Sequence, residues 1–440
     1  MSNSSTTNVT FTLNSGGRLS GTARVPGDKS ISHRSIMLGS LAEGTTEVSG
    51  FLEGEDSLAT LKAFQAMGVQ IEGPDNGKVM IRGVGLHGLK KPDDDLYLGN
   101  SGTSMRLMCG LLAGQQFNTV LTGDKSLSSR PMRRVIDPLM QMGAALGATQ
   151  NGTSPITVSV SESLHGIDYT LPVASAQIKS CLLLAGLYAD GKTCVTEPAP
   201  TRDHTERMLQ GFGYTVHRDG AKVCLRGKGH LQATSIDVPA DISSAAFFMV
   251  GASIAEGSDV TLEHVGINPT RTGVIDILRL MGANIEIFNE REVGGEPVAD
   301  IRIRSSQLKG INIPEELVPL AIDEFPVLFV AASCSSGQTI LTGAKELRVK
   351  ESDRIQVMAD GLQIMGIDAQ PTEDGIVIQG GRLQGGTVTS HGDHRISMSF
   401  AMAALCCQDD VTIEDCANVD TSFPGFVSLA SQLGLSIFSE

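Results

Sequence analysis

The stretch IDILRLMGANI (residues 275–285) carries the pattern that decides the fold. Its apolar residues recur at helical spacing as far as Met281, and after Gly282 the spacing changes to near-alternation. A glycine at such a change of period ends a helix and leads into a strand. The same pattern occurs at five other places: LKAFQAMGVQI (61–71), IDPLMQMGAAL (136–146), ERMLQGFGYTV (206–216), ADGLQIMGIDA (359–369) and LASQLGLSI (429–437). The chain therefore contains six copies of one unit, with marker glycines roughly 70 to 85 residues apart.

A second element precedes each of these patterns. It consists of a helix of small and apolar residues and then a short strand rich in Thr and Val, as in SMRLMCGLLAG (104–114) followed by NTVLTG (118–123). Because these helices are apolar around most of their circumference, we expect them to be buried on nearly all sides. The repeat is thus α/β, with helices inside and sheets outside.

Six units divide into three plus three, because VPGDKSIS (25–32) has a counterpart in VPADISSA (238–245). We predict two inside-out α/β domains, each of three βαβαββ-type units, with one domain over 26–238 and the other over 1–25 plus 239–440. The N-terminal stretch FTLNSGGRLSGTARV (11–25) is expected to pair with the C-terminal half, which leaves two connecting strands as a hinge.

Composition excludes several classes of protein. A net charge of −15, 4% aromatic residues and no Trp argue against a nucleic-acid surface. Residues 1–10 lack the basic and apolar regions of a signal peptide, and no window reaches the ~18 apolar residues of a membrane span. We therefore expect a cytoplasmic protein. The eight cysteines show no CxxC or zinc-type spacing, so we interpret them as reduced core residues.

Candidate anion-binding loops stand out against this acidic background. GDKSISHR (27–34) places Lys29 and Ser30 at a helix start and Arg34 one turn later, where backbone amides and cations would meet a phosphate or carboxylate. The alternative for this motif alone is a solvated helix cap with a surface lysine. In LGNSGTSMRL (98–107), Gly102 would allow the backbone to approach a ligand closely. The alternative for this motif is an ordinary capped turn, because Asn and Gly favour turns.

Further loops in the first half have the same character. SSRPMRR (128–134) supplies Arg130, Arg133 and Arg134, of which at least one is expected on the surface. PVASAQIKS (172–180) supplies Ser175 and Gln177, and PTRDHTER (200–207) supplies Arg202. Neutral hydrogen-bonding groups beside cations suit a polyhydroxylated anion, although each could also be a structural cap.

The C-terminal half adds carboxylates to the cations. Asp323 stands just before an apolar repeat helix, RVKESDR (348–354) brings Lys350, Glu351 and Arg354 together, and HGDHRIS (391–397) adds His394 and Arg395. Asp323 and Glu351 could divide the roles of base and acid, because their surroundings decide which of them holds a proton. For residues 350–354 alone, a solvent-facing helix with charge pairs is an equal alternative.

The position of these clusters favours an enzyme over a repeat scaffold that only presents a binding surface. Nearly every cationic cluster falls at a helix start of the repeat, in both halves, whereas chance would scatter them. Helix starts gathered on one face would create a strongly positive site, which predicts a substrate with several negative charges.

In these motifs the chain resembles the 5-enolpyruvylshikimate-3-phosphate synthases (3-phosphoshikimate 1-carboxyvinyltransferases). DKSISHR, GNSGTSMR, LSSRPM, RVKESDR, GDHR and SFPGF match in order, and KSISHRSIMLGSLAEG with LEGED is similar to the class II subgroup. The resemblance implies transfer of the enolpyruvyl group of phosphoenolpyruvate to shikimate 3-phosphate, by addition and elimination, on the way to chorismate and aromatic amino acids. It implies that the enzyme uses no metal or organic cofactor, and we separately expect a monomer.

The resemblance also implies roles for individual residues. Glu351 would protonate phosphoenolpyruvate, Asp323 would be the base for the shikimate 5-hydroxyl, and Lys29 would serve both substrates. The implied shikimate 3-phosphate contacts are Lys29, Ser30, Arg34, Ser175, Ala176, Gln177, Arg202, Asp323 and Lys350. The implied phosphoenolpyruvate contacts are Lys29, Gly102, Arg130, Gln177, Arg354, His394 and Arg395.

Two departures from the family pattern remain. Where many relatives have a lysine before the terminal Phe-Pro, this chain has Asp420, Thr421 and Ser422, and Ala176 replaces a second serine. The nearest rival is the sister enolpyruvyl transferase that acts on a UDP-linked amino sugar and uses a loop cysteine. The comparable loop here, GDKSLSSRPM (123–132), contains none.

Overall fold

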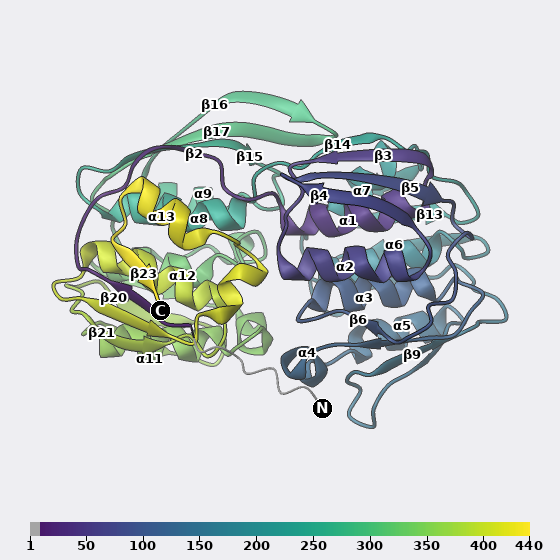
Figure 1. Ribbon diagram of the computed structural model, residues 1–440. Helices are drawn as coiled ribbons and strands as arrows, with labels where there is room; N and C mark the ends of the chain where they lie inside the picture. The colour runs from purple at the N-terminus through teal and green to yellow at the C-terminus, as the bar shows by residue number, and fades with distance from the viewer. Residues whose placement is uncertain (1–8) are drawn as a thin grey trace. The chain divides into compact units, whose positions relative to one another are not determined.

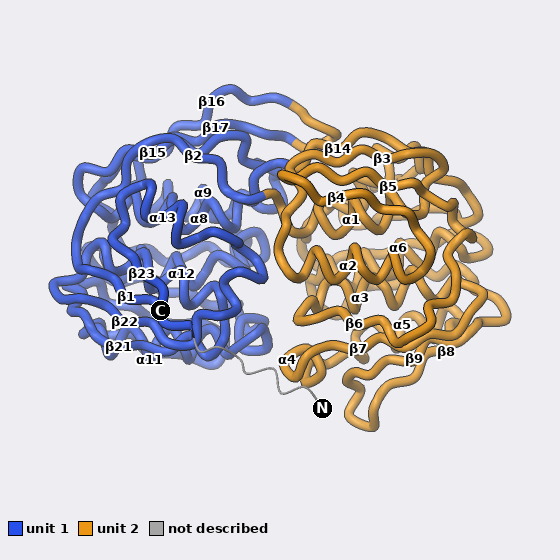
Figure 2. Tube along the Cα trace, in the orientation of Figure 1, with its two compact units in different colours: residues 1–26, 239–291, 297–440 blue, residues 27–238, 292–296 orange. Residues whose placement is uncertain are grey.

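The computed structural model describes residues 9–440, so most of the N-terminal stretch judged for a signal peptide lies outside it. Contacts divide the chain into unit 1 (residues 1–26, 239–291 and 297–440) and unit 2 (residues 27–238 and 292–296) (Figure 2). The segment 292–296, which the sequence did not single out, is the tip of a hairpin otherwise in unit 1. No helix among the described residues is long and apolar enough to cross a membrane.

Unit 2 contains three four-stranded sheets around three central helices. The strand orders are β14 (Ser235–Asp237), β3 (Glu43–Ser49), β5 (Lys78–Val84), β4 (Gln70–Asp75); then β6 (Leu96–Tyr97), β7 (Thr119–Thr122), β9 (Ile156–Ser159), β8 (Ala145–Gly147); and β10 (Asp168–Thr170), β11 (Lys192–Thr196), β13 (Lys222–Arg226), β12 (Val216–Asp219). The central helices are α1 (Lys29–Leu41), α3 (Gly102–Leu112) and α6 (Ala176–Gly186), and the others are α2 (Glu55–Ala66), α4 (Lys125–Ser129), α5 (Arg133–Gln141) and α7 (His204–Gly211). In Figure 1 the central helices α1, α3 and α6 lie between the sheets of the unit.

Unit 1 repeats the plan with two four-stranded sheets and one of three strands. The strand orders are β16 (Asn284–Val293), β17 (Glu296–Arg304), β15 (Asp259–Gly266), β2 (Ser20–Ala23); then β18 (Gln338–Leu341), β20 (Ile376–Gln379), β19 (Asp368–Pro371); and β21 (Gly386–Thr389), β22 (Val411–Glu414), β1 (Phe11–Leu13), β23 (Ile437–Ser439). The helices are α8 (Ile242–Ile254), α10 (Phe325–Ser333) and α12 (His394–Ala403) at the centre, α9 (Gly273–Leu280), α11 (Arg354–Ile364) and α13 (Phe426–Leu433) outside them, and the 3-10 turns η1 (Glu315–Leu317), η2 (Lys345–Val349), η3 (Ala404–Cys406) and η4 (Ala417–Thr421).

The expected βαβαββ repeat is confirmed by strand pairing. In the second copy, β6 and β7 pair in parallel across α3, and β8 and β9 follow α5 as an antiparallel pair. The N-terminal strands also pair with the C-terminal half as expected. β1 lies antiparallel between β22 and β23, with Thr12 opposite Thr412 and Phe438, and β2 runs parallel to β15.

The six marker glycines share one backbone conformation. Gly68, Gly143, Gly213, Gly282, Gly366 and Gly434 all have positive φ, between 80° and 115°. Residues with a Cβ rarely adopt this conformation, and glycine adopts it freely at a helix end. The change of period seen in the sequence therefore corresponds to the same turn six times.

The central helices are buried on nearly all sides, as their composition predicts. In α8 every residue from Ile242 to Ser253 is buried, and α3 packs closely on α6. A Cβ added at Gly110 of α3 would lie 2.0 Å from the carbonyl oxygen of Cys181 in α6. Small residues in these helices therefore permit backbone to approach backbone.

The expectation of eight reduced cysteines is wrong for one pair. Cys194 and Cys224 occupy directly opposed positions on β11 and β13 and form a disulfide. A search for close Cys-x-x-Cys spacing cannot find partners that are 30 residues apart and meet only through strand pairing. The other six cysteines are free, and Cys109, Cys181, Cys407 and Cys416 among them are buried.

Candidate functional site

Many of the residues expected to bind substrates lie at the starts of helices. In unit 2 these starts belong to the central helices α1, α3 and α6, and in unit 1 to α10, α11 and α12. Lys29, Gly102 and Ala176 are first residues in unit 2, Arg354 and His394 are first residues in unit 1, and Asp323 stands two residues before α10. Amide N–H groups without a helical partner and the positive end of the helix dipole favour anions at such positions.

Lys29 and Arg34 of α1 are both fixed by other side chains of unit 2. Lys29 Nζ lies 2.9 Å from Asp56 Oδ2 at the start of α2. Arg34 is buried, and it donates from Nε to Thr205 Oγ1 (2.7 Å) and from Nη2 to Ser180 Oγ (2.9 Å). The guanidinium of Arg34 therefore connects α1 with α6 and α7.

A buried polar cluster aligns the starts of α1, α2 and α3. His33 Nδ1 lies 2.8 Å from Thr60 Oγ1 and 3.2 Å from Ser104 Oγ, and Ser101, the N-cap of α3, contacts Ser104 Oγ at 2.7 Å. Burial lowers the pKa of His33 to about 3, and the nearby Lys29 and Arg34 act in the same direction against Asp56. The imidazole is therefore neutral at pH 7 and serves as a structural link between the three helices.

The helix start at Gly102 is surrounded by arginines. A Cβ at Gly102 would lie 3.1 Å from Nη1 of Arg106 and 3.1 Å from Nη1 of Arg130. Arg130 is buried and donates from Nη2 to Asn100 Oδ1 (2.6 Å), while Arg106 donates from Nη1 to Gln177 Oε1 (2.5 Å). Two guanidinium groups and a helix start thus converge beside Gly102, which is a geometry suited to a small anion.

Ser175, Ala176 and Gln177 begin α6. Ser175 is its N-cap and accepts from the Ile178 amide (3.4 Å). Gln177 donates to Thr103 Oγ1 (3.1 Å) in addition to its contact with Arg106, so the starts of α3 and α6 lie together.

Arg202 lies in a loop that a buried ion cluster supports. Glu197 Oε2 accepts from the Thr201 amide (3.1 Å) and lies 3.0 Å from Lys179 Nζ. Lys179 is fully buried and also lies 2.6 Å from Glu206 Oε1. Charges buried in this way need partners, and here the partners order the backbone that leads into Arg202.

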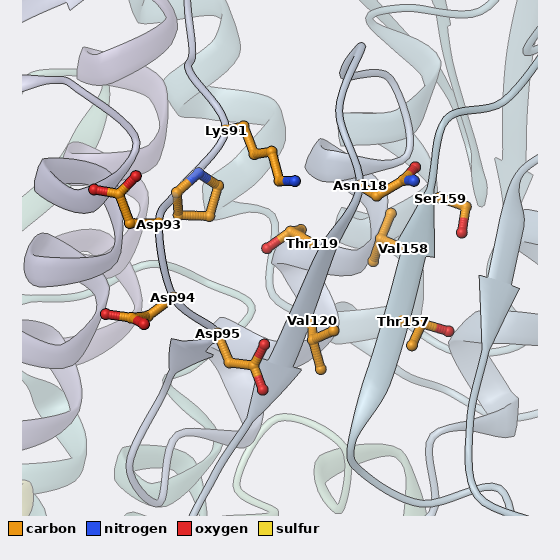
Figure 3. A pocket seen from close by; sticks show the side chains of 11 residues that line it. Lys91, Asp93, Asp94, Asp95, Asn118, Thr119, Val120, Thr157, Val158 and Ser159 are labelled. Atoms are coloured by element: carbon orange, nitrogen blue, oxygen red, sulfur yellow. The ribbon is translucent and has the colours of Figure 1, made fainter.

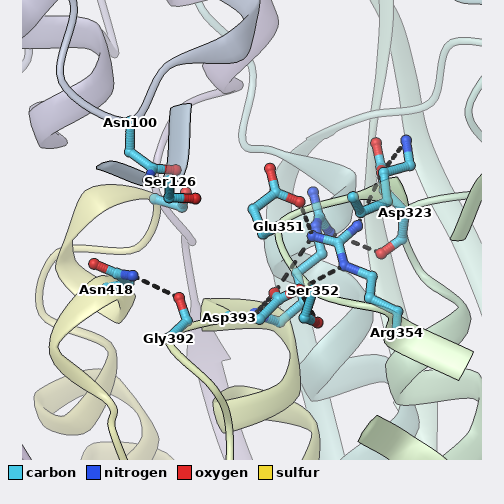
Figure 4. A network of polar contacts seen from close by, with 12 residues as sticks. Asn100, Ser126, Asp323, Glu351, Ser352, Arg354, Gly392, Asp393 and Asn418 are labelled. Carbon is cyan, nitrogen blue, oxygen red and sulfur yellow. Dashed lines mark hydrogen bonds and ion pairs between the residues drawn. The ribbon is translucent and has the colours of Figure 1, made fainter. Parts of the chain in front are cut away.

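In unit 1, one buried arginine serves three carboxylates (Figure 4). Arg354 Nη2 donates to Glu351 Oε2 (2.6 Å), Nε to Asp393 Oδ2 (2.9 Å) and Nη1 to Asp323 Oδ1 (3.3 Å). Burial alone would lower the pKa of Arg354, but the three carboxylates outweigh it and raise that pKa above its ordinary value. Likewise burial would raise the pKa of Asp393, but Arg354 holds it below the usual range.

Two further cations join this group. Lys350 Nζ lies 3.3 Å from Asp323 Oδ1, and Arg395 Nη1 donates to the Asp323 carbonyl oxygen (3.0 Å). His394, the first residue of α12, is 7% exposed. The alternative of a solvent-facing charged helix for residues 350–354 is therefore wrong for Arg354, which is 1% exposed.

The structure adds residues that the sequence reasoning missed. Asp393 caps α12 and binds Arg354, Asp56 binds Lys29, and Asn100 binds Arg130. Each lies within or next to a motif already recognised, and an acidic or amide residue within two positions of a helix start was the available signal. At the position of the missing lysine, Thr421 Oγ1 instead donates to the Asn418 carbonyl (2.6 Å).

The three arginines of 128–134 separate as expected. Arg130 is buried beside Gly102, whereas Arg133 is exposed at the start of α5 and donates to the Gln150 carbonyl (3.4 Å). Of these three arginines only Arg130 is buried, and its burial supports its assignment to the site.

A cavity of about 340 Å³ lies elsewhere in unit 2 (Figure 3). It is lined by residues at the start of β7 and the end of β9 and by the segment 91–95, which carries Lys91 and three consecutive aspartates. None of the predicted site residues lines it. Three of its lining residues are aspartates, whose charge would repel a phosphorylated substrate, so we exclude this cavity as the anion site.

Comparison with known proteins agrees with this geometry. A family model described as EPSP synthase (3-phosphoshikimate 1-carboxyvinyltransferase) matches residues 13–429. The chain is 70% identical over 429 residues to 3-phosphoshikimate 1-carboxyvinyltransferase of Methylococcus capsulatus (98% of each chain), and 69% identical over 428 residues to that of Alkalilimnicola ehrlichii (97% of this chain, 96% of the relative).

Solved structures of similar proteins have the same fold as this chain. The EPSP synthase of Acinetobacter baumannii superposes with a TM-score of 0.89 at 60% identity and covers 99% of this chain and 100% of its own. The enolpyruvyl transferase NikO from Streptomyces tendae is only 14% identical but has a TM-score of 0.80, with 98% of this chain and 99% of NikO covered, so it shares the fold.

Proposed function

This chain belongs to the EPSP synthase (3-phosphoshikimate 1-carboxyvinyltransferase) family, and on that premise we propose that Asp323 and Glu351 are its catalytic base and acid. The enzyme transfers the enolpyruvyl group of phosphoenolpyruvate to the 5-hydroxyl of shikimate 3-phosphate and releases phosphate, in the shikimate pathway to chorismate and aromatic amino acids. The observation that carries the residue assignment is the buried Arg354 guanidinium, shared by Asp323, Glu351 and Asp393.

The proposed substrate contacts follow the helix starts. For shikimate 3-phosphate they are Lys29, Ser30, Arg34, Ser175, Ala176, Gln177, Arg202, Asp323 and Lys350. For phosphoenolpyruvate they are Lys29, Gly102, Arg130, Gln177, Arg354, His394 and Arg395. In support, these positions combine fixed cations with helix N-termini, which together stabilise phosphate and carboxylate groups.

Glu351 must carry a proton to act as an acid, although it pairs with Arg354. Three cations, Arg354 with Lys350 and Arg395, lie beside three carboxylates at this point of the structure. A further anion that takes a share of Arg354 weakens its hold on Glu351 and favours the protonated form. We therefore expect phosphoenolpyruvate to bring the proton onto Glu351 when it binds.

The reaction then runs in two stages. Glu351 gives its proton to the methylene carbon of phosphoenolpyruvate, the 5-hydroxyl oxygen of shikimate 3-phosphate bonds to the adjacent carbon, and Asp323 accepts the hydroxyl proton. The tetrahedral adduct next loses a methyl proton to Glu351 as the C–O bond to phosphate breaks, which restores the double bond. Lys350 and Arg354, both 3.3 Å from Asp323 Oδ1, favour the ionised carboxylate that a base requires.

The test of this function compares two acceptors in a phosphate-release assay with phosphoenolpyruvate. Shikimate 3-phosphate should support turnover, and UDP-N-acetylglucosamine, the acceptor of the sister enzyme, should not. Turnover only with the UDP-sugar would overturn the proposal. Asp323→Asn should lower kcat by at least about 100-fold, the usual contribution of a general base.

We also propose that the enzyme is a cytoplasmic monomer of the class II subgroup that binds no nucleic acid. The net charge of −15 and the scarcity of aromatic residues support the last point. The mass of the enzyme in solution, measured by light scattering, tests whether the enzyme is a monomer.

A further inference from the structure

Glu324, the N-cap of α10, is a buried carboxylate that the proposed reaction does not use. It is 3% exposed, it accepts a hydrogen bond from Ser243 Oγ, and its Oε1 lies 3.8 Å from Arg395 Nη1. Its side chain makes no hydrogen bond to the start of its own helix. An ordinary capping role therefore does not account for this residue.

The contacts of Arg395 explain what Glu324 can do. The same nitrogen, Nη1, that faces the Glu324 carboxylate also donates to the Asp323 carbonyl oxygen (3.0 Å). Two neighbouring residues thus hold one edge of the guanidinium, one by a hydrogen bond and the other by charge. Because a guanidinium is planar and rigid, fixing one of its nitrogens sets the direction of the others.

The Glu324 carboxylate is itself anchored from α8 and the segment before α9. Arg271 Nη2 donates to Ser243 Oγ (2.6 Å) and to Asp241 Oδ1 (3.0 Å), and Asp241 caps α8. Ser243 therefore accepts from Arg271 while it donates to Glu324. All of these residues belong to unit 1.

Charges alternate along this chain of contacts. Asp241, Arg271, Glu324 and Arg395 contribute two negative and two positive charges, and the first three are less than 9% exposed. Buried charges are tolerated when they are paired, so a purely structural role would also be satisfied here. A purely structural role predicts that replacing Glu324 lowers the stability of the protein and changes KM for both substrates equally.

We infer that Glu324 is a positioning residue for phosphoenolpyruvate, which holds the Arg395 guanidinium in the orientation that binds this substrate. The inference rests on the proposed assignment of Arg395 to phosphoenolpyruvate. Without the carboxylate, the arginine samples other rotamers, and substrate binding must order it again. Ordering one long side chain costs about 0.5–1.5 kcal/mol, or roughly two- to tenfold in affinity.

Glu324→Gln tests the inference, because the amide oxygen still accepts from Ser243 while the charge is lost. We expect KM for phosphoenolpyruvate to rise about fivefold, with KM for shikimate 3-phosphate changed less than about twofold. Ser243→Ala, which leaves every charge in place, should give a smaller rise of the same kind. It also provides the decisive measurement if Glu324→Gln does not fold. Glu315→Gln, an exposed carboxylate that accepts from Thr342, is the matched control and should leave both KM values unchanged.

The opposite result is physically possible and would overturn the inference. Removing a negative charge beside an anion site strengthens long-range attraction, so KM for phosphoenolpyruvate would fall if charge balance mattered more than orientation. Equal changes in both KM values together with a lower Tm would indicate the structural role and would also overturn it. Arg395→Ala distinguishes a failure of the proposed phosphoenolpyruvate site from a failure of the positioning role of Glu324. If this variant leaves KM for phosphoenolpyruvate unchanged, the proposed site assignment fails; if it raises KM but Glu324→Gln does not, only the positioning role fails.

Discussion

Gly102→Ala is the most direct probe of the proposed phosphoenolpyruvate site in unit 2. The added Cβ would lie 3.1 Å from Nη1 of both Arg106 and Arg130, whereas comfortable contacts begin near 3.5 Å. Neither arginine can move freely, because Gln177 holds Arg106 at 2.5 Å and Asn100 holds Arg130 at 2.6 Å. The substitution must therefore displace a guanidinium or the substrate by about half an ångström.

A misplacement of about 1 Å at a reacting substrate can lower the rate about 100-fold, so a shift of half that size should lower kcat/KM for phosphoenolpyruvate about tenfold, equivalent to about 1.4 kcal/mol. We expect this loss to appear as a higher KM for phosphoenolpyruvate, while KM for shikimate 3-phosphate changes little. Stability should not fall, because Gly102 is the first residue of α3 and lacks positive φ.

Steady-state kinetics with each substrate varied in turn, together with Tm, measure these effects. Gly211→Ala is the control, since Gly211 ends α7 and a Cβ there meets nothing within 4 Å. An unchanged KM for phosphoenolpyruvate in Gly102→Ala, with a normal Tm, would refute the placement of this substrate beside Gly102.

Three other predictions follow from the same contacts. Glu351→Gln should lower kcat for phosphate release at least about 100-fold and abolish proton uptake on phosphoenolpyruvate binding, as calorimetry in buffers of different ionisation enthalpy would show; wild-type turnover contradicts the acid role. Lys29→Met should weaken both substrates, whereas Lys62→Met on the exposed face of α2 should weaken neither, and unchanged affinity for either substrate in Lys29→Met argues against the shared role. The pKa of His33 is about 3 in the folded chain, against the ordinary histidine value of 6.5, so its contribution to stability is present above pH 6.5 and is lost as pH falls towards 3, at about 1.4 kcal/mol per pH unit. His33→Asn should make Tm fall less steeply below pH 6.5, and a slope equal to that of the wild type would show that another group is responsible.

The fold could be predicted from the sequence because its main determinants are local. A glycine with positive φ after an amphipathic helix leaves the same trace at Gly68 and at Gly282, and the two Val-Pro sites lie at the boundaries of the contact-defined units. The hairpin tip at 292–296 and the Cys194–Cys224 pair could not be predicted, because they depend on which distant strands become neighbours.

The candidate site was predictable to a lesser degree. Cations and carboxylates within one motif, such as Glu351 and Arg354, were visible as a group, and the structure places them in contact. Asp393 and Glu324 were not singled out, since each acts through an arginine from a different segment. A residue that positions another residue from a distant segment has no fixed sequence spacing to it, so no local motif reveals the pair.

Pairing of β1 with β22 and β23 has a consequence for synthesis of the chain. Thr12 lies opposite Thr412 and Phe438, so β1 cannot find its partners until these much later parts of the chain have left the ribosome. The segment 27–238 carries all of unit 2 except 292–296 and can start to fold much earlier. Until residues 411–439 have been synthesised, β1 stays a single strand with exposed backbone groups, which are open to pairing with other chains. Unit 1 therefore completes this sheet late in synthesis, and the partly synthesised chain is the form in which β1 is exposed to aggregation.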